Sequence, residues 1–168
     1  NFVIKKASDG SVLVTENDYS SSSYSSSYTY TPTEDGELLV EVEPEGVSSF
    51  LSYESDSAEA LLRVEQFGTV EWQTMQNAFR GCTNMQFAEG IASPDLSQVT
   101  DMRYMFSGCA SFNQPLNNWD VSQVTDMCDM FSGCTSFNQD LGMWKLRNCR
   151  ELGLDNCGMS VENYSKSL

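Results

Sequence analysis

A tandem repeat in the second half of the chain constrains the fold more than any other feature. Residues 99–123 read VTDMRYMFSGCASFNQPLNNWDVSQ, and residues 124–148 repeat the pattern without a gap as VTDMCDMFSGCTSFNQDLGMWKLRN. A looser copy begins at Trp72, and a degenerate fourth copy begins at Cys149. A period of about 20–50 residues is typical of a solenoid, in which each unit buries its apolar face against its neighbours.

The first half of each copy predicts one turn of helix. In the first full copy, Met102, Met105 and Phe106 follow at i, i+3 and i+4, which gathers them on one helical face. Asp101 precedes them as a candidate N-cap, and Gly108 follows where a left-handed residue would end the helix. One helical turn is unstable alone in water, so we expect it to pack against the neighbouring copies.

The second half of each copy predicts a strand. Leu116-x-x-Trp119-x-Val121 follows the strand pattern of leucine-rich repeats, whose strands pair into a parallel sheet. The predicted fold class is therefore an α/β repeat. It is a short leucine-rich-repeat-like solenoid, with one short strand and one short helical turn per repeat.

The repeated string WDVSQVTDMxxMFSGCxSFNQxL resembles the BspA-like leucine-rich repeat surface proteins, in the variant with a WDVS-VTDM-MF-C-FN core. The resemblance covers roughly Leu61 to Cys157 and is strongest between Trp72 and Leu146. It implies attachment to a bacterial cell envelope, and adhesion to host proteins, other cells or matrix.

The N-terminal part predicts a small antiparallel β cap or stalk. Phe2 to Glu16 is expected to form a hairpin around Asp9-Gly10, and Glu37 to Glu43 alternates as a strand. The Ser/Tyr-rich segment 19–30 fits either a flexible linker or a strand with a face of small residues. The predicted domains are 1–55 and 56–168, with repeats near 72–98, 99–123, 124–148 and 149–168.

Composition excludes several classes of function. A net charge of −15 argues against nucleic acid and against electrostatic docking on anionic lipid, because both need basic groups. The sequence contains no run of 18 apolar residues, so it predicts no membrane span. The chain begins at Asn1 without a signal-like stretch, so we expect any targeting segment to be missing from it.

The cysteines predict packing rather than chemistry. Cys82, Cys109 and Cys134 recur in register and are expected to stack as a buried ladder. With no histidine and no C-x-x-C pair, we expect neither a metal site nor a cofactor, and no His-based catalytic device can exist. We predict that the chain is not an enzyme. The sequence does not decide whether Cys128, Cys149 or Cys157 forms a disulfide.

Two repeated polar or aromatic positions could be read as ligand contacts. Asn113 and Asn138 are better explained as side chains that bond the backbone of adjacent copies. Trp119 and Trp144 could serve as sugar-stacking platforms, but they occupy an inward position of the strand pattern. We therefore expect both tryptophans in the core.

The residues that flank the tryptophans predict the binding surface. If the leucine and tryptophan positions point inward, those between them point outward, and successive copies align them in columns about 4.8 Å apart. The candidate partner-binding residues are Ser93, Asn118 and Met143 in one column, and Asp95, Asp120 and Lys145 in the second.

The predicted function is a non-catalytic binding module, secreted or displayed on the cell surface, which recognises a host or extracellular protein or glycan. The alternative is a structural or receptor-binding part of a fibre or envelope assembly, such as a phage tail fibre. The oligomeric state does not follow from the sequence.

Overall fold

The computed structural model describes residues 2–6, 12–16, 38–42, 49 and 56–166. The chain divides into two compact units, Asn1–Gly46 and Val47–Leu168. The predicted boundary after residue 55 and the Ser/Tyr-rich segment 19–30 lie outside the described residues, so the domain bounds stay a prediction.

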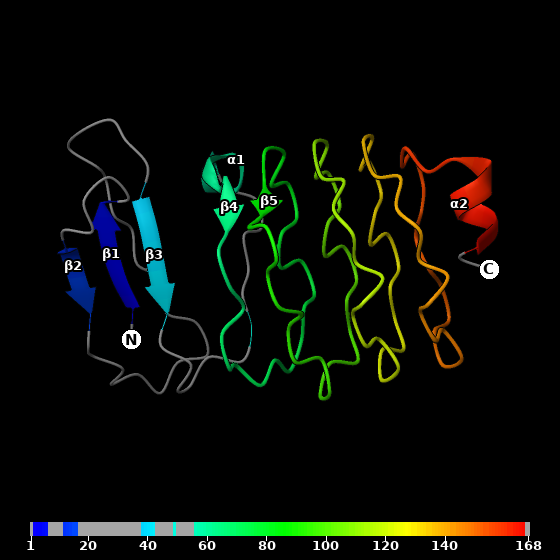
Figure 1. Ribbon diagram of the computed structural model, residues 1–168, viewed down its shortest axis with the longest axis horizontal. Helices are drawn as coiled ribbons and strands as arrows, with labels where there is room; N and C mark the ends of the chain where they lie inside the picture. The colour runs from blue at the N-terminus through cyan, green and yellow to red at the C-terminus, as the bar shows by residue number, and fades with distance from the viewer. Residues whose placement is uncertain (1, 7–11, 17–37, 43–48, 50–55, 167–168) are drawn as a thin grey trace. The chain divides into compact units, whose positions relative to one another are not determined.

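The first unit contains a three-stranded antiparallel sheet with the strand order β2-β1-β3 (Figure 1). Its strands are β1 (Phe2–Lys6), β2 (Val12–Glu16) and β3 (Leu38–Val42). Phe2 at the start of β1 pairs with residues of both β2 and β3. The antiparallel pairing of the first two strands and the third strand expected at this end of the chain are therefore confirmed, whereas the expected turn at Asp9-Gly10 lies outside the described residues.

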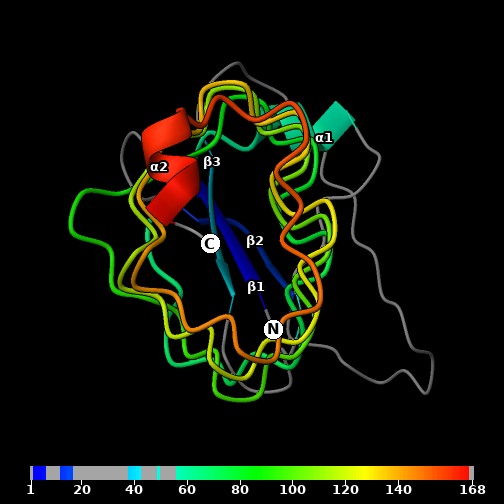
Figure 2. The ribbon, with the colours of Figure 1, turned by 90° about the vertical axis from the view of Figure 1, so that its right-hand side faces the viewer.

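The second unit has little regular secondary structure in its described residues. Its elements are α1 (Asp56–Ala60), β4 (Arg63–Val64), β5 (Gln86–Phe87) and α2 (Val161–Lys166). β4 and β5 pair in parallel. Further along, the chain forms only isolated parallel bridges, such as the one between Asp101 and Asp126. In the view of Figure 2 the traces of successive copies overlie one another.

Each copy is held to the next by a series of backbone hydrogen bonds from alternate residues. The amides of Met102, Tyr104 and Phe106 donate to carbonyls of the following copy, at 2.9, 3.0 and 3.0 Å. The looser first copy follows the same pattern, since the amide of Met75 donates to the carbonyl of Asp101 at 3.0 Å. These bonds satisfy backbone groups that would be costly to bury unpaired.

The predicted leucine-rich-repeat-like solenoid, with a strand and a helical turn in every repeat, is wrong. The described copies contain tight turns where strands and helical turns were expected. The predicted helical turn fails because the amide of Phe106 donates to Met130 in the next copy and cannot close a bond to Met102. Tyr104, at φ +57°, also interrupts any helix.

The expected N-cap residues still accept hydrogen bonds, although no helix follows them. The Oδ1 atom of Asp101 accepts from the amide of Arg103 at 3.0 Å, and that of Asp126 accepts from the amide of Cys128 at 3.1 Å. An aspartate that bonds the amide two residues ahead forms an Asx turn. The same short oxygen side chains therefore start a turn in place of a helix.

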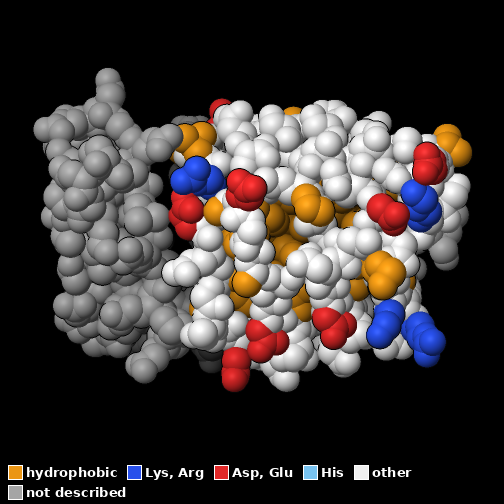
Figure 3. Space-filling view, in the orientation of Figure 1, with side chains coloured by type: hydrophobic (Ala, Val, Ile, Leu, Met, Phe, Trp, Pro, Cys, Tyr) orange, Lys and Arg blue, Asp and Glu red, His pale blue; other side chains and the backbone are white. Residues whose placement is uncertain are grey.

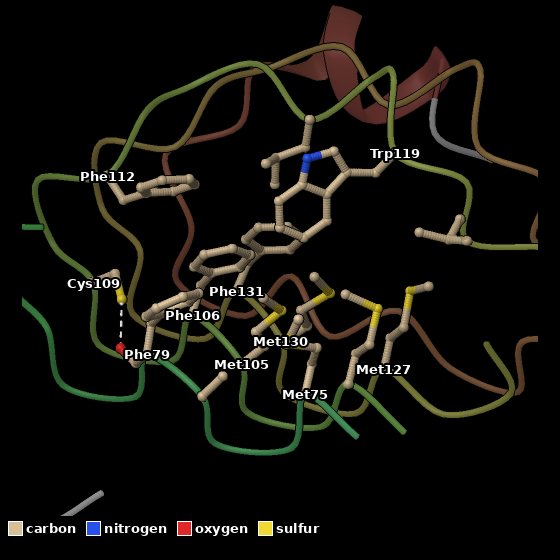
Figure 4. Packing of buried hydrophobic residues seen from close by; sticks show 14 of the residues in the cluster. Met75, Phe79, Met105, Phe106, Cys109, Phe112, Trp119, Met127, Met130 and Phe131 are labelled. Atoms are coloured by element: carbon tan, nitrogen blue, oxygen red, sulfur yellow. Dashed lines mark hydrogen bonds between the residues drawn. The ribbon is translucent and has the colours of Figure 1, made fainter. Parts of the chain in front are cut away.

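The core of the second unit contains two rows of aromatic rings, and Figure 4 shows the row of Phe79, Phe106 and Phe131 with Phe112 beside it. Phe106 stacks on Phe79 at 5.7 Å and on Phe131 at 5.6 Å between ring centroids. Phe112 stacks on Phe106 at 4.6 Å and on Phe137 at 6.1 Å. Such offset ring contacts stabilise a core beyond the area that they bury.

The fourth copy fits only because it carries glycines at two close contacts. A Cβ atom on Gly153 would lie 2.1 Å from the backbone nitrogen of Asp129, and one on Gly158 would lie 2.2 Å from the carbonyl oxygen of Thr135. Gly153 breaks the repeat pattern in sequence, and the reason is this close backbone approach. After them α2 begins, and Asn163 within it donates to the carbonyl of Asn138 at 2.9 Å.

Candidate functional site

The six predicted partner-binding residues lie mainly on the surface of the second unit. Met143 is 72% exposed, although it is apolar. Ser93 is half-buried, and the other four residues are exposed: Asp95, Asn118, Asp120 and Lys145. We call these six residues the turn face.

Turns, rather than strands, direct these side chains outward. The amide of Trp119 donates to the carbonyl of Leu116 at 3.0 Å, so Asn118 sits at the corner of a β-turn. Trp144 closes the equivalent turn, which presents Met143. The outward direction was predicted correctly, but its cause is the corner of a turn between two buried residues.

Two Asx turns hold the second column. The Oδ1 atom of Asp95 accepts from the amide of Ser97 at 3.0 Å, and that of Asp120 accepts from the amide of Ser122 at 3.1 Å. Hydrogen bonds from Ser97 and Ser122 lower the pKa of the two carboxyl groups, so both stay ionised at neutral pH. The repeated Asp-x-Ser spacing was the sequence signal for these turns.

Hydrogen bonds across copies fix the first column. The hydroxyl of Ser93 donates to the carbonyl of Asn118 at 3.5 Å. The amide of Met143 donates to the side-chain Oδ1 of Asn117 at 3.0 Å. Asn117 was missed at the sequence level, because it differs between the copies and its role depends on the turn that follows it in the next copy.

The turn face changes sign along its length. Asp95 and Asp120 are negative, whereas Lys145 occupies the equivalent place in the next copy and is positive. The positive charge of Lys145 contributes to the lowered pKa of Asp120, after the larger effects of the bonds from Ser122. Figure 3 shows one face of this unit, on which acidic and basic side chains gather separately along one edge.

Other charged side chains of this unit are already paired within the chain. The guanidinium of Arg103 pairs with Asp101 at 2.7 Å and with Asp126 at 3.7 Å. The guanidinium of Arg80 lies 5.0 Å from the ring centroid of Tyr104. Because these charges already have partners within the chain, they offer less to an external partner than the turn face does.

The cysteine ladder is buried and unsuited to reaction. Cys82, Cys109 and Cys134 are fully buried, as predicted, and all the described cysteines are free thiols. The thiol of Cys134 donates to the carbonyl of Phe106 at 2.8 Å, and burial raises its pKa to about 12. Burial likewise raises the pKa of Cys109 far above its usual range. Such protonated thiols are poor nucleophiles and poor metal ligands.

The remaining candidate ligand positions have structural roles. The Oδ1 atom of Asn113 accepts from the amide of Asn138 at 2.8 Å, so these asparagines bond adjacent copies as expected. Trp119 and Trp144 are buried, which removes them as sugar platforms. Among the described residues no group of His, Cys, Asp and Glu side chains could hold a metal ion. No helix of the described part is both long and apolar enough to cross a bilayer.

These features define a protein of tandem 25-residue sequence repeats, joined by turns, with an apolar interior and an exposed face of mixed charge. The chain belongs to the family described as Mycoplasma protein of unknown function, DUF285, whose model matches residues 51–154. That match covers more than half of the chain, including the turn face. Comparisons with curated proteins and with solved structures find no match.

Proposed function

We propose that this chain is a non-catalytic recognition module of a secreted or surface-displayed protein, and that its turn face contacts a host or extracellular protein or glycan. The BspA-like resemblance of the repeat supports a role in adhesion at a cell surface. The family match is compatible with this role, and it includes every residue of the turn face.

One observation carries the proposal: the two full copies agree inside and differ outside. Buried positions such as Phe106, Cys109 and Trp119 are identical in the next copy. With one exception, Val121 against Leu146, every position at which the copies differ is exposed or half-buried in both. A fixed frame beneath a variable surface is what a recognition scaffold requires.

The chemistry of the turn face suits specific contacts. It offers carboxylates, an ammonium, an amide and an exposed thioether, and its backbone is fixed by Asx turns and cross-copy bonds. A preorganised surface loses little conformational entropy on binding. The flexible thioether of Met143 can adapt to an apolar contact beside Lys145.

An array of extracellular proteins and glycans, probed with the full chain, tests the proposal. The informative variant combines Asp120→Asn with Lys145→Gln, because an asparagine can still accept from the amide of Ser122. Its matched control combines Arg150→Gln with Glu151→Gln, which also removes one charge of each sign from exposed positions. We expect the first pair to weaken binding by about tenfold or more and the control to leave it unchanged.

Binding that survives in the folded Asp120→Asn, Lys145→Gln variant would place recognition outside the turn face. A full-length chain that binds nothing on a broad array would argue against the recognition role itself.

A further inference from the structure

The turn face belongs to a longer line of charge. Glu71 pairs with Asp95 in a parallel bridge, so it continues the column on the side away from Asp120. Arg147 comes two residues after Lys145 in the same copy and is exposed. We call Glu71, Asp95, Asp120, Lys145 and Arg147 the charged column. Its first three residues are acidic and its last two are basic.

The charged column has no salt bridges among the described residues, although Lys145 stabilises the charge of Asp120 from the next copy. None of the five residues forms a salt bridge with another described residue, in contrast to Arg103 and Lys166, which do. Neighbouring copies lie about 4.8 Å apart, so the acidic residues repel one another by about 0.2–1 kcal/mol for each adjacent pair. A cationic group placed against Asp120 would relieve this repulsion, and Lys145 could pair with an anionic group.

The central pair of the column, Asp120 and Lys145, is complementary to itself. A two-fold axis can pass between the copy that carries Asp120 and the copy that carries Lys145. This axis places Asp120 of one chain opposite Lys145 of a second chain, and Lys145 of the first opposite Asp120 of the second. The same rotation sets Asn118 opposite Met143, so that the exposed thioether faces an amide rather than water. Symmetric dimers need such a self-complementary patch, in which residue i meets residue j and j meets i.

From this arrangement we infer that the partner of the turn face is a second copy of this chain, docked antiparallel through Asp120–Lys145 pairs in both directions. This inference rests on the proposed function, because it names the partner of the same face. A contact between copies on two cell surfaces, or on one, would then make recognition homophilic.

Charge and size set the conditions under which the dimer forms. A net charge of −15 on each chain opposes association at long range, and salt screens that repulsion beyond about 10 Å at 0.1 M. Pairs in direct contact are screened less, so association should be strongest near 0.1 M salt and weaker at both 0.01 M and 1 M. A patch of this extent gives a weak dimer, to be measured at about 0.5 mM protein.

Sedimentation equilibrium with charge reversals tests the inference. Asp120→Lys makes the centre of the face basic, and Lys145→Asp makes it acidic. Both new side chains fit, because the neighbouring copy carries each residue type at the equivalent place. The matched controls, Glu151→Lys and Arg150→Asp, change the net charge by the same amounts at other exposed positions.

We expect the wild-type chain to dimerise. Each face variant alone should associate at least about tenfold more weakly than the wild type. An equimolar mixture of the two face variants should recover the dimer, since both pairs are again attractive. The two controls should dimerise like the wild type, apart from the small effect of net charge.

A wild-type chain that stays monomeric, face variants that dimerise normally, or a mixture that fails to recover would each overturn the inference. The proposed function fails separately. If the wild-type chain is monomeric but binds an array component through Asp120 and Lys145, recognition stands and the homophilic partner does not.

Discussion

The indole Nε1 atom of Trp144 donates to the carbonyl oxygen of Leu116 at 2.8 Å, across the boundary between two copies. Trp144 is buried, so this bond satisfies a donor and an acceptor that water does not reach. The tryptophan therefore fills the interior and also fixes the turn beneath the turn face.

Replacing Trp144 separates these two roles. Trp144→Phe keeps most of the apolar volume but leaves the carbonyl of Leu116 without this donor, so we expect a loss of about 1–3 kcal/mol in the free energy of unfolding. Trp144→Ala should cost roughly 3–5 kcal/mol, because a cavity is added. Urea unfolding of both variants measures the difference, and equal stability of Trp144→Phe and wild type would contradict the hydrogen-bonding role.

The middle ring of the aromatic row should matter most. Phe106 stacks on Phe79, Phe112 and Phe131, so Phe106→Ala removes these three stacking contacts and leaves a cavity. We expect a loss of roughly 3–5 kcal/mol. Hydrogen exchange should show faster opening first in the flanking copies, and unchanged protection of the residues around Phe131 would contradict this expectation.

Alkaline pH should destabilise the protein through its buried thiols. The pKa of Cys134 rises from 9.0 to about 12 on folding, so the stabilising effect is complete below pH 9 and is lost as pH rises towards 12. The free energy of unfolding should fall by about 1.4 kcal/mol per pH unit for such a thiol in this window. Unfolding of Cys134→Ala between pH 8 and 11 should depend less steeply on pH than that of the wild type.

The close approach at Gly153 predicts a local effect. Gly153→Ala places a Cβ atom against the backbone of Asp129, whereas Gly68→Ala meets no atom within 4 Å. Gly153→Ala should lower the free energy of unfolding by about 1–3 kcal/mol through overpacking. Hydrogen exchange should become faster within residues 149–166. Gly68→Ala carries only the strain of its positive φ, so exchange in 149–166 should stay unchanged in that control.

In the repeated part of the chain the core could be predicted from the sequence, whereas the secondary structure could not. Periodicity identified Met102, Met105 and Phe106 as neighbours in the interior, and all three are fully buried. The same spacing misled the prediction of a helix, because i, i+3 contacts also arise in a chain of tight turns. The amide of Met105 bonds the carbonyl of Met102 three residues back, as in a turn.

The exposure of the candidate site followed from the pattern, but its internal geometry did not. Side chains between Leu116 and Trp119 had to point outward once those two residues were buried. The bonds from Asn117 to Met143 and from Ser93 to Asn118 depend on how copies meet in space, which a single copy does not encode. The Asx turns at Asp95 and Asp120 could have been recognised from Asp-x-Ser alone.

The backbone bonds between copies also determine how the molecule would respond to force. Bonds such as that from Gly108 to Ser132, at 2.8 Å, tie together residues one copy apart along the chain. Tension applied at the C-terminal end would load these bonds one copy at a time, starting from the last. Each release would extend the chain by at most about 80–90 Å, the contour length of 25 residues. The chain would then lengthen in steps under load, while the copies still in contact kept their turns and charges in place.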